Sequence, residues 1–313
     1  MKKLYLLLLL PLFLLGGCSG FLYTNLPPVE FQDINYSYPT KTALQNPSIA
    51  YIDEGKGDKT IILIHGLASN AGFWRYAIPE LSKEYRVIAV DLPGYGKSGK
   101  GAYPYSISFY AEQIKRLADE LKIDKFTLVG HSMGGQIGIK FALMFPEKLD
   151  KLVLASPAGV EEFLQGQGDW LRSVMTKKGV KTTTEEGIRR NLAGNFYSWN
   201  DKWEWMVEER VRMINAKDFD EFTYTVVRCV NAMLDEPTFD KIKNIKTPTL
   251  IVYGRYDGLI PNPYLNPGFT SDVFKWGAEQ IRGSKLHEID NCGHMLQIEK
   301  PEEFTSAILN FLK

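Results

Sequence analysis

The stretch that decides the fold is Leu128-Val129-Gly130-His131-Ser132-Met133-Gly134-Gly135. It continues an apolar run over residues 126–129 that predicts a buried strand, and it leads into an apolar segment that predicts a helix over residues 135–145. The glycines on both sides of Ser132 allow a tight, strained turn, because a side chain there would collide with neighbouring backbone. The stretch therefore predicts a strand, a sharp turn and a helix, with the serine hydroxyl presented at the turn.

Short apolar runs alternate with helical patterns along most of the chain. Five further runs predict strands, over residues 61–64, 86–90, 152–155, 249–253 and 285–289. The spacing of apolar residues also predicts helices over residues 110–121 and 301–312. Strands that are apolar throughout are buried on both faces, so the pattern predicts a mostly parallel sheet with helices on each side.

The alternation stops between residues 161 and 245, where helical periodicity, many charges and four of the six tryptophans occur. We interpret residues 46–160 and 246–313 as one core and residues 161–245 as a helical insertion. The tryptophans fit two roles that the sequence does not separate. They could wall a ligand pocket, or they could pack a small core within the insertion.

The N-terminus is different in kind from the rest of the chain. Lys2 and Lys3 precede an unbroken apolar run over residues 4–15, which is shorter than the roughly 18 residues of a comfortable membrane span. Small residues and Cys18 follow, which indicates a signal peptide over residues 1–17. The segment resembles the lipobox of bacterial lipoproteins, in which the cysteine is lipidated; an uncleaved anchor or a plain signal peptide are the alternatives. We expect an exported protein of the bacterial cell envelope, held to a membrane through Cys18, with residues 18–45 as a tether.

Composition excludes some classes of partner. Lys plus Arg (37) balances Asp plus Glu (37), so no basic footprint predicts binding to nucleic acid. After Cys18, only Cys229 and Cys292 remain, which is too few to define a disulfide framework, and whether they pair stays open. No spacing of ligating residues predicts a metal site, and no cofactor is expected. The oligomeric state is not predicted.

A serine hydroxyl needs a base, and the chain has four histidines. His131 adjoins Ser132, but neighbouring side chains diverge at a tight turn, so we expect it to pack or to line a pocket. His287 lies within a predicted strand, and His65 ends one before Gly66, where it would orient the following loop. His294, in a loop between the last strand and the last helix, is the best candidate for the base.

The base in turn needs an acid that holds its tautomer. Asp257 follows the strand over residues 249–253 in a loop and is the best candidate. Asp290 is a rival but is read as a turn residue, and Asp91 precedes the serine within a glycine-rich turn.

Negative charge that develops on a carbonyl oxygen needs two backbone donors. The N–H of Met133, directly after the serine, would supply one. Leu67, in His65-Gly66-Leu67 after the first clear strand, would supply the other.

These segments together resemble the α/β-hydrolase fold family with a helical cap inserted after the sixth strand. The matching motifs are Ile64-His65-Gly66, Asp91-Leu92-Pro93-Gly94-Tyr95-Gly96-Lys97-Ser98, Gly130-His131-Ser132-Met133-Gly134-Gly135, Tyr253-Gly254-Arg255-Tyr256-Asp257 and Gly293-His294. The chain order Ser132, Asp257, His294 is that of the family's catalytic residues. A serine at the nucleophile differs from the haloalkane dehalogenases and epoxide hydrolases, and no His-Gly-Gly-Gly motif is present.

The resemblance implies a serine hydrolase that forms an acyl-enzyme on Ser132. Within the family, the sequence is most similar in character to monoacylglycerol lipases and carboxylesterases with a helical cap. The expected substrates are therefore carboxylic esters, with acylglycerols or other lipid-like esters foremost. Another hydrolase of the same fold is the alternative: a peptidase, a thioesterase or a C–C bond hydrolase. A non-catalytic binding protein that keeps the fold is a further alternative, and a perhydrolase side activity would use the same residues.

Overall fold

A computed structural model of the protein describes residues 22–313. The predicted signal peptide and Cys18 lie outside the described residues, so both stay predictions. Between Leu22 and Lys313, no helix is both long enough and apolar enough to cross a membrane.

Within residues 22–313, eight strands form one sheet in the order β1-β2-β4-β3-β5-β6-β7-β8. The pairs β1–β2 and β2–β4 are antiparallel, and every other pair is parallel. The strands are β1 (Lys41–Ala43), β2 (Ile49–Glu54), β3 (Thr60–Ile64), β4 (Arg86–Val90), β5 (Phe126–His131), β6 (Leu149–Ala155), β7 (Thr249–Gly254) and β8 (Lys285–Ile289). The predicted mostly parallel sheet is confirmed.

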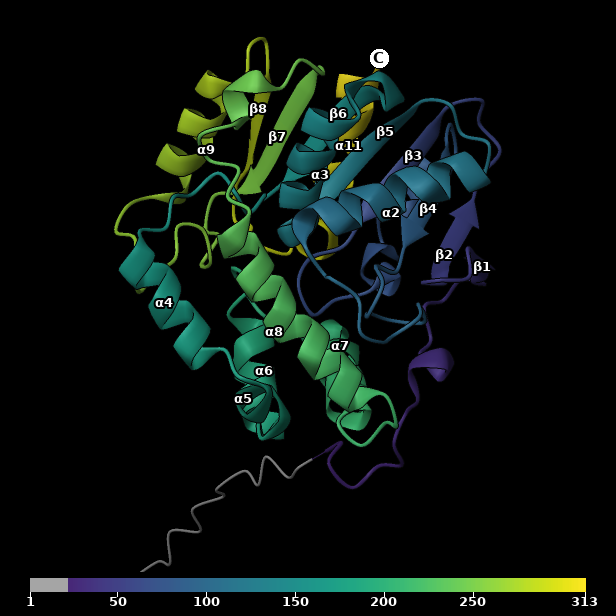
Figure 1. The fold of residues 1–313 in the computed structure, drawn as a ribbon, viewed down its shortest axis with the longest axis vertical. Coiled ribbons are helices and arrows are strands. Elements are labelled where there is room, and N and C mark those ends of the chain that lie inside the picture. The colour runs from purple at the N-terminus through teal and green to yellow at the C-terminus, as the bar shows by residue number, and fades with distance from the viewer. Residues whose placement is uncertain (1–21) are drawn as a thin grey trace, which may run out of the picture.

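Helices cover both faces of this sheet (Figure 1). α2 and α3 lie in front of it, and α11 lies behind it with α1, which packs against α11 and β4. The helices outside the insertion are α1 (Ile78–Leu81), α2 (Ile107–Glu120), α3 (Met133–Met144), α9 (Thr270–Gln280), α10 (Leu296–Glu299) and α11 (Pro301–Leu312). Because helices shield each face, strands such as β3 and β5 are buried along their whole length.

The insertion lies between β6 and β7, as the sequence predicts, and projects from one end of the sheet (Figure 1). We call its helices the cap helices: α4 (Gln165–Val174), α5 (Lys177–Lys181), α6 (Glu185–Ala193), α7 (Glu204–Met213) and α8 (Phe219–Asp235). Trp203 is buried in a cluster with Phe196 and Met206, and Trp199 and Trp205 pack against that cluster. Among the described residues, no tryptophan lines the main cavity. The role of packing the insertion therefore fits these side chains better than the role of a pocket wall.

Residues 18–45 are predicted as a tether, but part of this segment packs into the core and the sheet. Phe31, Ile34 and Tyr36 are almost completely buried, and β1 joins the sheet. The Tyr36 hydroxyl donates to the buried carboxylate of Asp91 at 2.8 Å. The prediction missed this because isolated apolar residues among polar ones carry no periodicity, although each can fill a site in a core.

Candidate active site

Ser132 lies between the end of β5 and the start of α3, with φ +55° and ψ −118°, a conformation that a residue other than glycine adopts only under constraint. The constraint is close packing of backbone. A Cβ on Gly130 would lie 2.1 Å from the carbonyl oxygen of Gly134, and a Cβ on Gly134 would lie 2.4 Å from that of Ile64. The turn is therefore tight enough to require both glycines, and it presents Ser132 to a cavity.

His294 and Asp257 meet in the structure from loops that follow β8 and β7. The Nδ1 atom of His294 lies 2.7 Å from Oδ2 of Asp257, and both side chains are buried. The other carboxylate oxygen accepts the backbone N–H groups of Leu259 at 2.9 Å and Ile260 at 3.2 Å. Burial by itself would raise the pKa of Asp257, but His294 and these donors hold the pKa below its ordinary value. An ionised Asp257 keeps the proton on Nδ1 of His294 and leaves Nε2 free to accept one.

His131 contacts the candidate base. Its Nε2 atom lies 2.9 Å from the backbone carbonyl oxygen of His294, and the two rings are 4.8 Å apart. A carbonyl oxygen only accepts, so Nε2 of His131 carries the proton and donates it. Burial, with a smaller contribution from His294, lowers the pKa of His131 to about 3, which keeps the ring neutral.

His65 fixes the start of the loop that contains Leu67. Its Nδ1 atom lies 2.7 Å from the carbonyl oxygen of Gly66, and its Nε2 accepts the N–H of Leu92 at 3.1 Å. Burial lowers the pKa of His65 to about 4, so the neutral ring bridges two loops as donor and acceptor. Leu67 lines the cavity beside Ser132. Met133 is the first residue of α3, where a backbone N–H has no acceptor within its own helix.

Two adjacent ionisable side chains on α7, both partly buried, reach the same loop from the cap. Oε1 of Glu209 accepts the side-chain amide of Asn70 at 2.6 Å, and Arg210 donates to the carbonyl oxygen of Ala68. The Asn70 Oδ1 atom accepts the N–H of Gly72 at 2.9 Å, so this amide is held at both ends. Burial raises the pKa of Glu209 to about 7. Sequence reasoning missed this contact because nothing in a charged helical stretch tells which charges face inward.

The cavity has a volume of about 770 Å³ and lies between the carboxyl ends of the strands and the cap helices. Ser132 and His294 line it, and most of its wall is apolar. The apolar wall includes Phe73, Phe163, Leu171, Ile214, Phe219, Val226 and Val230. Arg210 brings a partly buried cation to this wall, and Gln136, Asn191 and Asn262 bring amides. Such a lining suits a small molecule that is largely apolar and carries a few polar groups.

The rival candidates lie elsewhere. Asp290 is exposed and pairs with Arg255 at 3.5 Å, and His287 is exposed on β8. Asp91 is buried, where it accepts the N–H groups of Ala71 and Lys97 at 2.7 Å each. Cys229 and Cys292 are both buried and unpaired. Across residues 22–313, no cluster of His, Cys, Asp and Glu suits a metal ion.

Proteins with assigned activities resemble this chain over most of its length. The 2-hydroxy-6-oxo-6-(2'-aminophenyl)hexa-2,4-dienoic acid hydrolase of Metapseudomonas resinovorans is 31% identical over 274 residues, covering 84% of this chain and 86% of that protein. The 2-hydroxy-6-oxononadienedioate/2-hydroxy-6-oxononatrienedioate hydrolase of Escherichia coli K12 is also 31% identical over 274 residues, covering 84% and 90%.

Solved structures give the same result. A probable hydrolytic enzyme of Pseudomonas aeruginosa PAO1 superposes with a TM-score of 0.79 at 28% identity, covering 92% of this chain and 99% of that one. A meta-cleavage product hydrolase of Pseudomonas fluorescens IP01 superposes with a TM-score of 0.72 at 28% identity, covering 89% and 98%.

These similarities correct the predicted substrate. The acids named in the relatives contain no ester, amide or thioester link, so their hydrolysis breaks a C–C bond. The prediction of an enzyme that cleaves carboxylic esters, acylglycerols foremost, is therefore wrong, and the alternative of a C–C bond hydrolase is better supported. The physical reason is that a serine, a histidine and an aspartate activate attack on any carbonyl carbon, while the leaving group is selected by the pocket.

The fold and the order of the motifs agree with a match to a protein family. Residues 59–301 match the family described as alpha/beta hydrolase fold, a match that includes Ser132, Asp257 and His294 and the whole insertion. The chain belongs to the alpha/beta hydrolase fold family and is a hydrolase of that fold.

Proposed function

We propose that this protein hydrolyses the C–C bond next to the 6-oxo group of 2-hydroxy-6-oxo-hexa-2,4-dienoic acids, with Ser132, His294 and Asp257 as its catalytic residues. The observation that carries the proposal is the 31% identity to hydrolases of such acids over 84% of the chain. The two relatives named above act on acids with different groups at C6, so the proposal leaves that group open.

The proposed reaction adds one water across the C5–C6 bond. A proton first adds at C5 as the 2-hydroxyl loses its proton and becomes a ketone. C5 can then leave C6 with the bonding electron pair, because the 2-oxo group can accept that pair. Ser132 Oγ then adds to the C6 carbonyl and gives its proton to Nε2 of His294. The C5–C6 bond breaks, and the electron pair moves back onto the 2-oxo group, which takes up a proton as 2-hydroxypenta-2,4-dienoate leaves.

Water then releases the second product. It attacks the C6 carbonyl carbon held on Ser132, with Nε2 of His294 as base, and frees the carboxylic acid and the serine hydroxyl. Asp257 stabilises the imidazolium in both halves, because it accepts the Nδ1 proton at 2.7 Å. The backbone N–H groups of Leu67 and Met133 are the proposed donors to the oxygen at C6.

Arg210 supports a substrate that is an anion. Its partly buried side chain lies in the mostly apolar wall of the cavity and donates to the carbonyl oxygen of Ala68. Burial lowers its pKa, which means that the cation is destabilised there and would gain from an anionic partner. We propose that the Arg210 guanidinium binds the C1 carboxylate of the substrate.

The test uses 2-hydroxy-6-oxo-6-phenylhexa-2,4-dienoate in ¹⁸O-labelled water. We expect loss of the dienolate absorbance, formation of benzoate and 2-hydroxypenta-2,4-dienoate in equal amounts, and one ¹⁸O atom in benzoate. Ser132→Ala should lower kcat by at least about 10³-fold. An enzyme that leaves this compound and its 6-alkyl analogues intact, but turns over p-nitrophenyl esters with a high kcat/KM, would overturn the proposal.

The assignment of Arg210 has its own comparison. For Arg210→Gln we expect KM for the free acid to rise about tenfold or more, because one charge-assisted contact is lost. KM for the methyl ester of the same acid should change little. The matched control is Arg190→Gln on α6, whose side chain is 78% exposed. Equal effects of Arg210→Gln on acid and methyl ester would contradict the assignment.

A further inference from the structure

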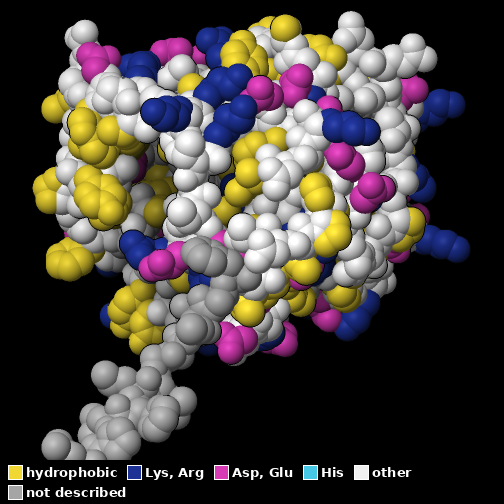
Figure 2. All heavy atoms as spheres, turned by 90° about the horizontal axis from the view of Figure 1, so that it is seen from below, with side chains coloured by type: hydrophobic (Ala, Val, Ile, Leu, Met, Phe, Trp, Pro, Cys, Tyr) yellow, Lys and Arg dark blue, Asp and Glu magenta, His cyan; other side chains and the backbone are white. Residues whose placement is uncertain are grey.

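Two segments beside the cavity carry exposed apolar side chains. On α4 and just before it, Leu164, Trp170 and Val174 are 65%, 43% and 49% exposed. Across the cavity mouth, the loop over residues 259–269 exposes Leu259, Tyr264 and Phe269 by 41%, 83% and 76%. Single exposed apolar residues are ordinary, but a gathered set marks an interaction surface. Figure 2 shows apolar side chains gathered on the side of the cap where α4 lies in Figure 1.

Hydrogen bonds join these two segments. The side-chain amide of Gln167 on α4 donates to the carbonyl oxygen of Leu265 and to Oδ1 of Asn266, each at 2.8 Å. The amide of Asn266 donates in turn to Glu161 and to the carbonyl oxygen of Glu162. The apolar side chains of α4 and of the loop over residues 259–269 therefore form one surface, which we call the mouth surface.

The mouth surface opens into the cavity that contains Ser132. Val174, Leu259 and Tyr264 are exposed and at the same time line the cavity. Whatever covers this surface therefore lies at the entrance through which a substrate reaches the serine.

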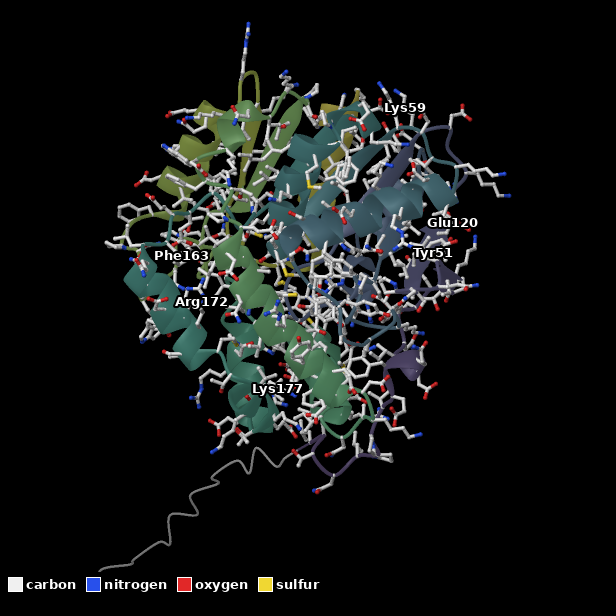
Figure 3. The ribbon with its side chains drawn as sticks, in the orientation of Figure 1. Tyr51, Lys59, Glu120, Phe163, Arg172 and Lys177 are labelled. Carbon is white, nitrogen blue, oxygen red and sulfur yellow. The ribbon has the colours of Figure 1, made fainter. Side chains whose placement is uncertain are left out.

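A basic segment adjoins the mouth surface. α5 follows α4 after two residues, and Thr176 before it and Gly179 and Val180 within it line the cavity. Arg172 pairs with Asp169 and Asp235, and Lys181 pairs with Asp220, whereas the exposed Lys177 and Lys178 form no ion pair within residues 22–313. Figure 3 shows Arg172 and Lys177 on the cap, below the sheet in that view. Aromatic and aliphatic side chains beside free lysines suit the boundary of an anionic lipid bilayer.

The N-terminal chain approaches the core along the same cap. Glu185, at the start of α6, accepts the backbone N–H groups of Leu22, Tyr23 and Thr24 at 2.9, 3.0 and 2.9 Å. Thr183, two residues before Glu185, lines the cavity. The segment before Leu22 includes the apolar run over residues 4–15. A run that enters a bilayer would therefore hold the cap, rather than the far end of the sheet, next to lipid (Figure 1).

We propose that the mouth surface, together with Lys177 and Lys178, docks onto an anionic lipid bilayer, so that the cavity of Ser132 opens at the membrane. The proposal does not depend on which bond the enzyme hydrolyses. It depends on the exposed apolar groups and free lysines beside the cavity, and on the contact of the N-terminal chain with α6 of the same cap.

The experiment measures contact with lipid at Trp170. The full chain is mixed with phosphatidylglycerol vesicles whose acyl chains carry bromine, which quenches tryptophan fluorescence on contact. We expect clear quenching of the unaltered protein, and Trp170→Phe should remove at least half of it, although five tryptophans remain. Phenylalanine keeps the surface apolar, so binding itself should persist.

A matched reporter tests which side docks. Leu286 on β8 is 36% exposed, and Leu286→Trp in the Trp170→Phe background places a tryptophan on the edge strand of the sheet. We expect no added quenching there. Lys177→Gln with Lys178→Gln should weaken binding to phosphatidylglycerol vesicles severalfold and leave the weaker binding to phosphatidylcholine vesicles unchanged.

Three outcomes would overturn the proposal. The first is vesicle binding without quenching at Trp170, which would mean that the N-terminal segment binds lipid while the mouth surface faces water. The second is equal quenching at positions 170 and 286. The third is no quenching in the unaltered protein together with a dimer in sedimentation that Val174→Ser dissociates. The mouth surface would then bind a second copy of the chain.

Discussion

The side-chain amide of Asn70 donates to the partly buried carboxylate of Glu209 at 2.6 Å, and this contact joins the loop beside Ser132 to the cap. The loop carries Leu67, whose N–H is a proposed donor to the substrate oxygen. Arg210, the next residue of α7, holds the same loop at Ala68. The cap therefore does more than cover the cavity, because its α7 helix sets the position of a loop in the core.

Glu209→Ala should lower kcat about tenfold and change KM less, because a displaced loop weakens a contact made chiefly in the transition state. Glu209→Gln keeps an oxygen that accepts from Asn70, so its kcat should stay near that of the unaltered enzyme. Steady-state kinetics with the proposed dienoate substrate, alongside circular dichroism for folding, measures both.

The matched control is Glu208→Ala. Glu208 is also on α7, but it is 38% exposed and pairs with Arg212 on the surface. Its replacement should leave kcat within about twofold, since surface ion pairs contribute little. If Glu209→Gln lost as much activity as Glu209→Ala, the charge rather than the contact with Asn70 would be what matters.

The stability of the protein should depend on pH through Glu209. Burial raises its pKa from 4.5 to about 7, so between these values the folded chain holds a proton that the unfolded chain releases. This contribution to the free energy of unfolding is fully present below pH 4.5 and is lost as the pH rises through 7.

Denaturant unfolding of the unaltered protein and of Glu209→Gln, from pH 4.5 to 8, isolates this contribution. The unfolding free energy of the unaltered protein minus that of the variant should fall with rising pH, by on the order of 3 kcal/mol. A difference that stays flat across this range would show that Glu209 has an ordinary pKa in the folded chain.

Asp257→Asn should lower kcat by about 10⁴-fold, because an amide favours the wrong tautomer of His294 and does not stabilise its cation. KM should change little, since the apolar wall of the cavity is untouched. The control is Asp290→Asn, the exposed rival four residues before His294, which should retain activity within about twofold. A large loss in Asp290→Asn with activity retained in Asp257→Asn would reassign the acid.

The sequence predicts the elements whose apolar residues are periodic, and the loops whose order along the chain is fixed by the fold. Central strands and the helix after Ser132 carry apolar periodicity, and the loops with Asp257 and His294 follow strands in a fixed order. β1 and the burial of Tyr36 were missed because single apolar residues have no period. The contact of Glu209 with Asn70 was missed because it joins residues 139 positions apart. The bond that is hydrolysed was predicted wrongly, because the motifs around Ser132 encode attack on a carbonyl and leave the choice of leaving group to the cavity.

Substituting a glycine beside Ser132 tests the geometry of this turn directly. Gly130→Ala places a Cβ 2.1 Å from the backbone oxygen of Gly134, where no side chain can move aside, so β5 and α3 must separate. We expect a loss of about 3 kcal/mol or more in unfolding free energy and loss of activity. Gly166→Ala on α4 is the control, because nothing lies within 4 Å of its Cβ, and it should stabilise the chain by up to about 1 kcal/mol. If Gly130→Ala matched the control in denaturant unfolding, the strand and helix around Ser132 would be packed less closely than the structure requires, and the constraint on its backbone would have another source.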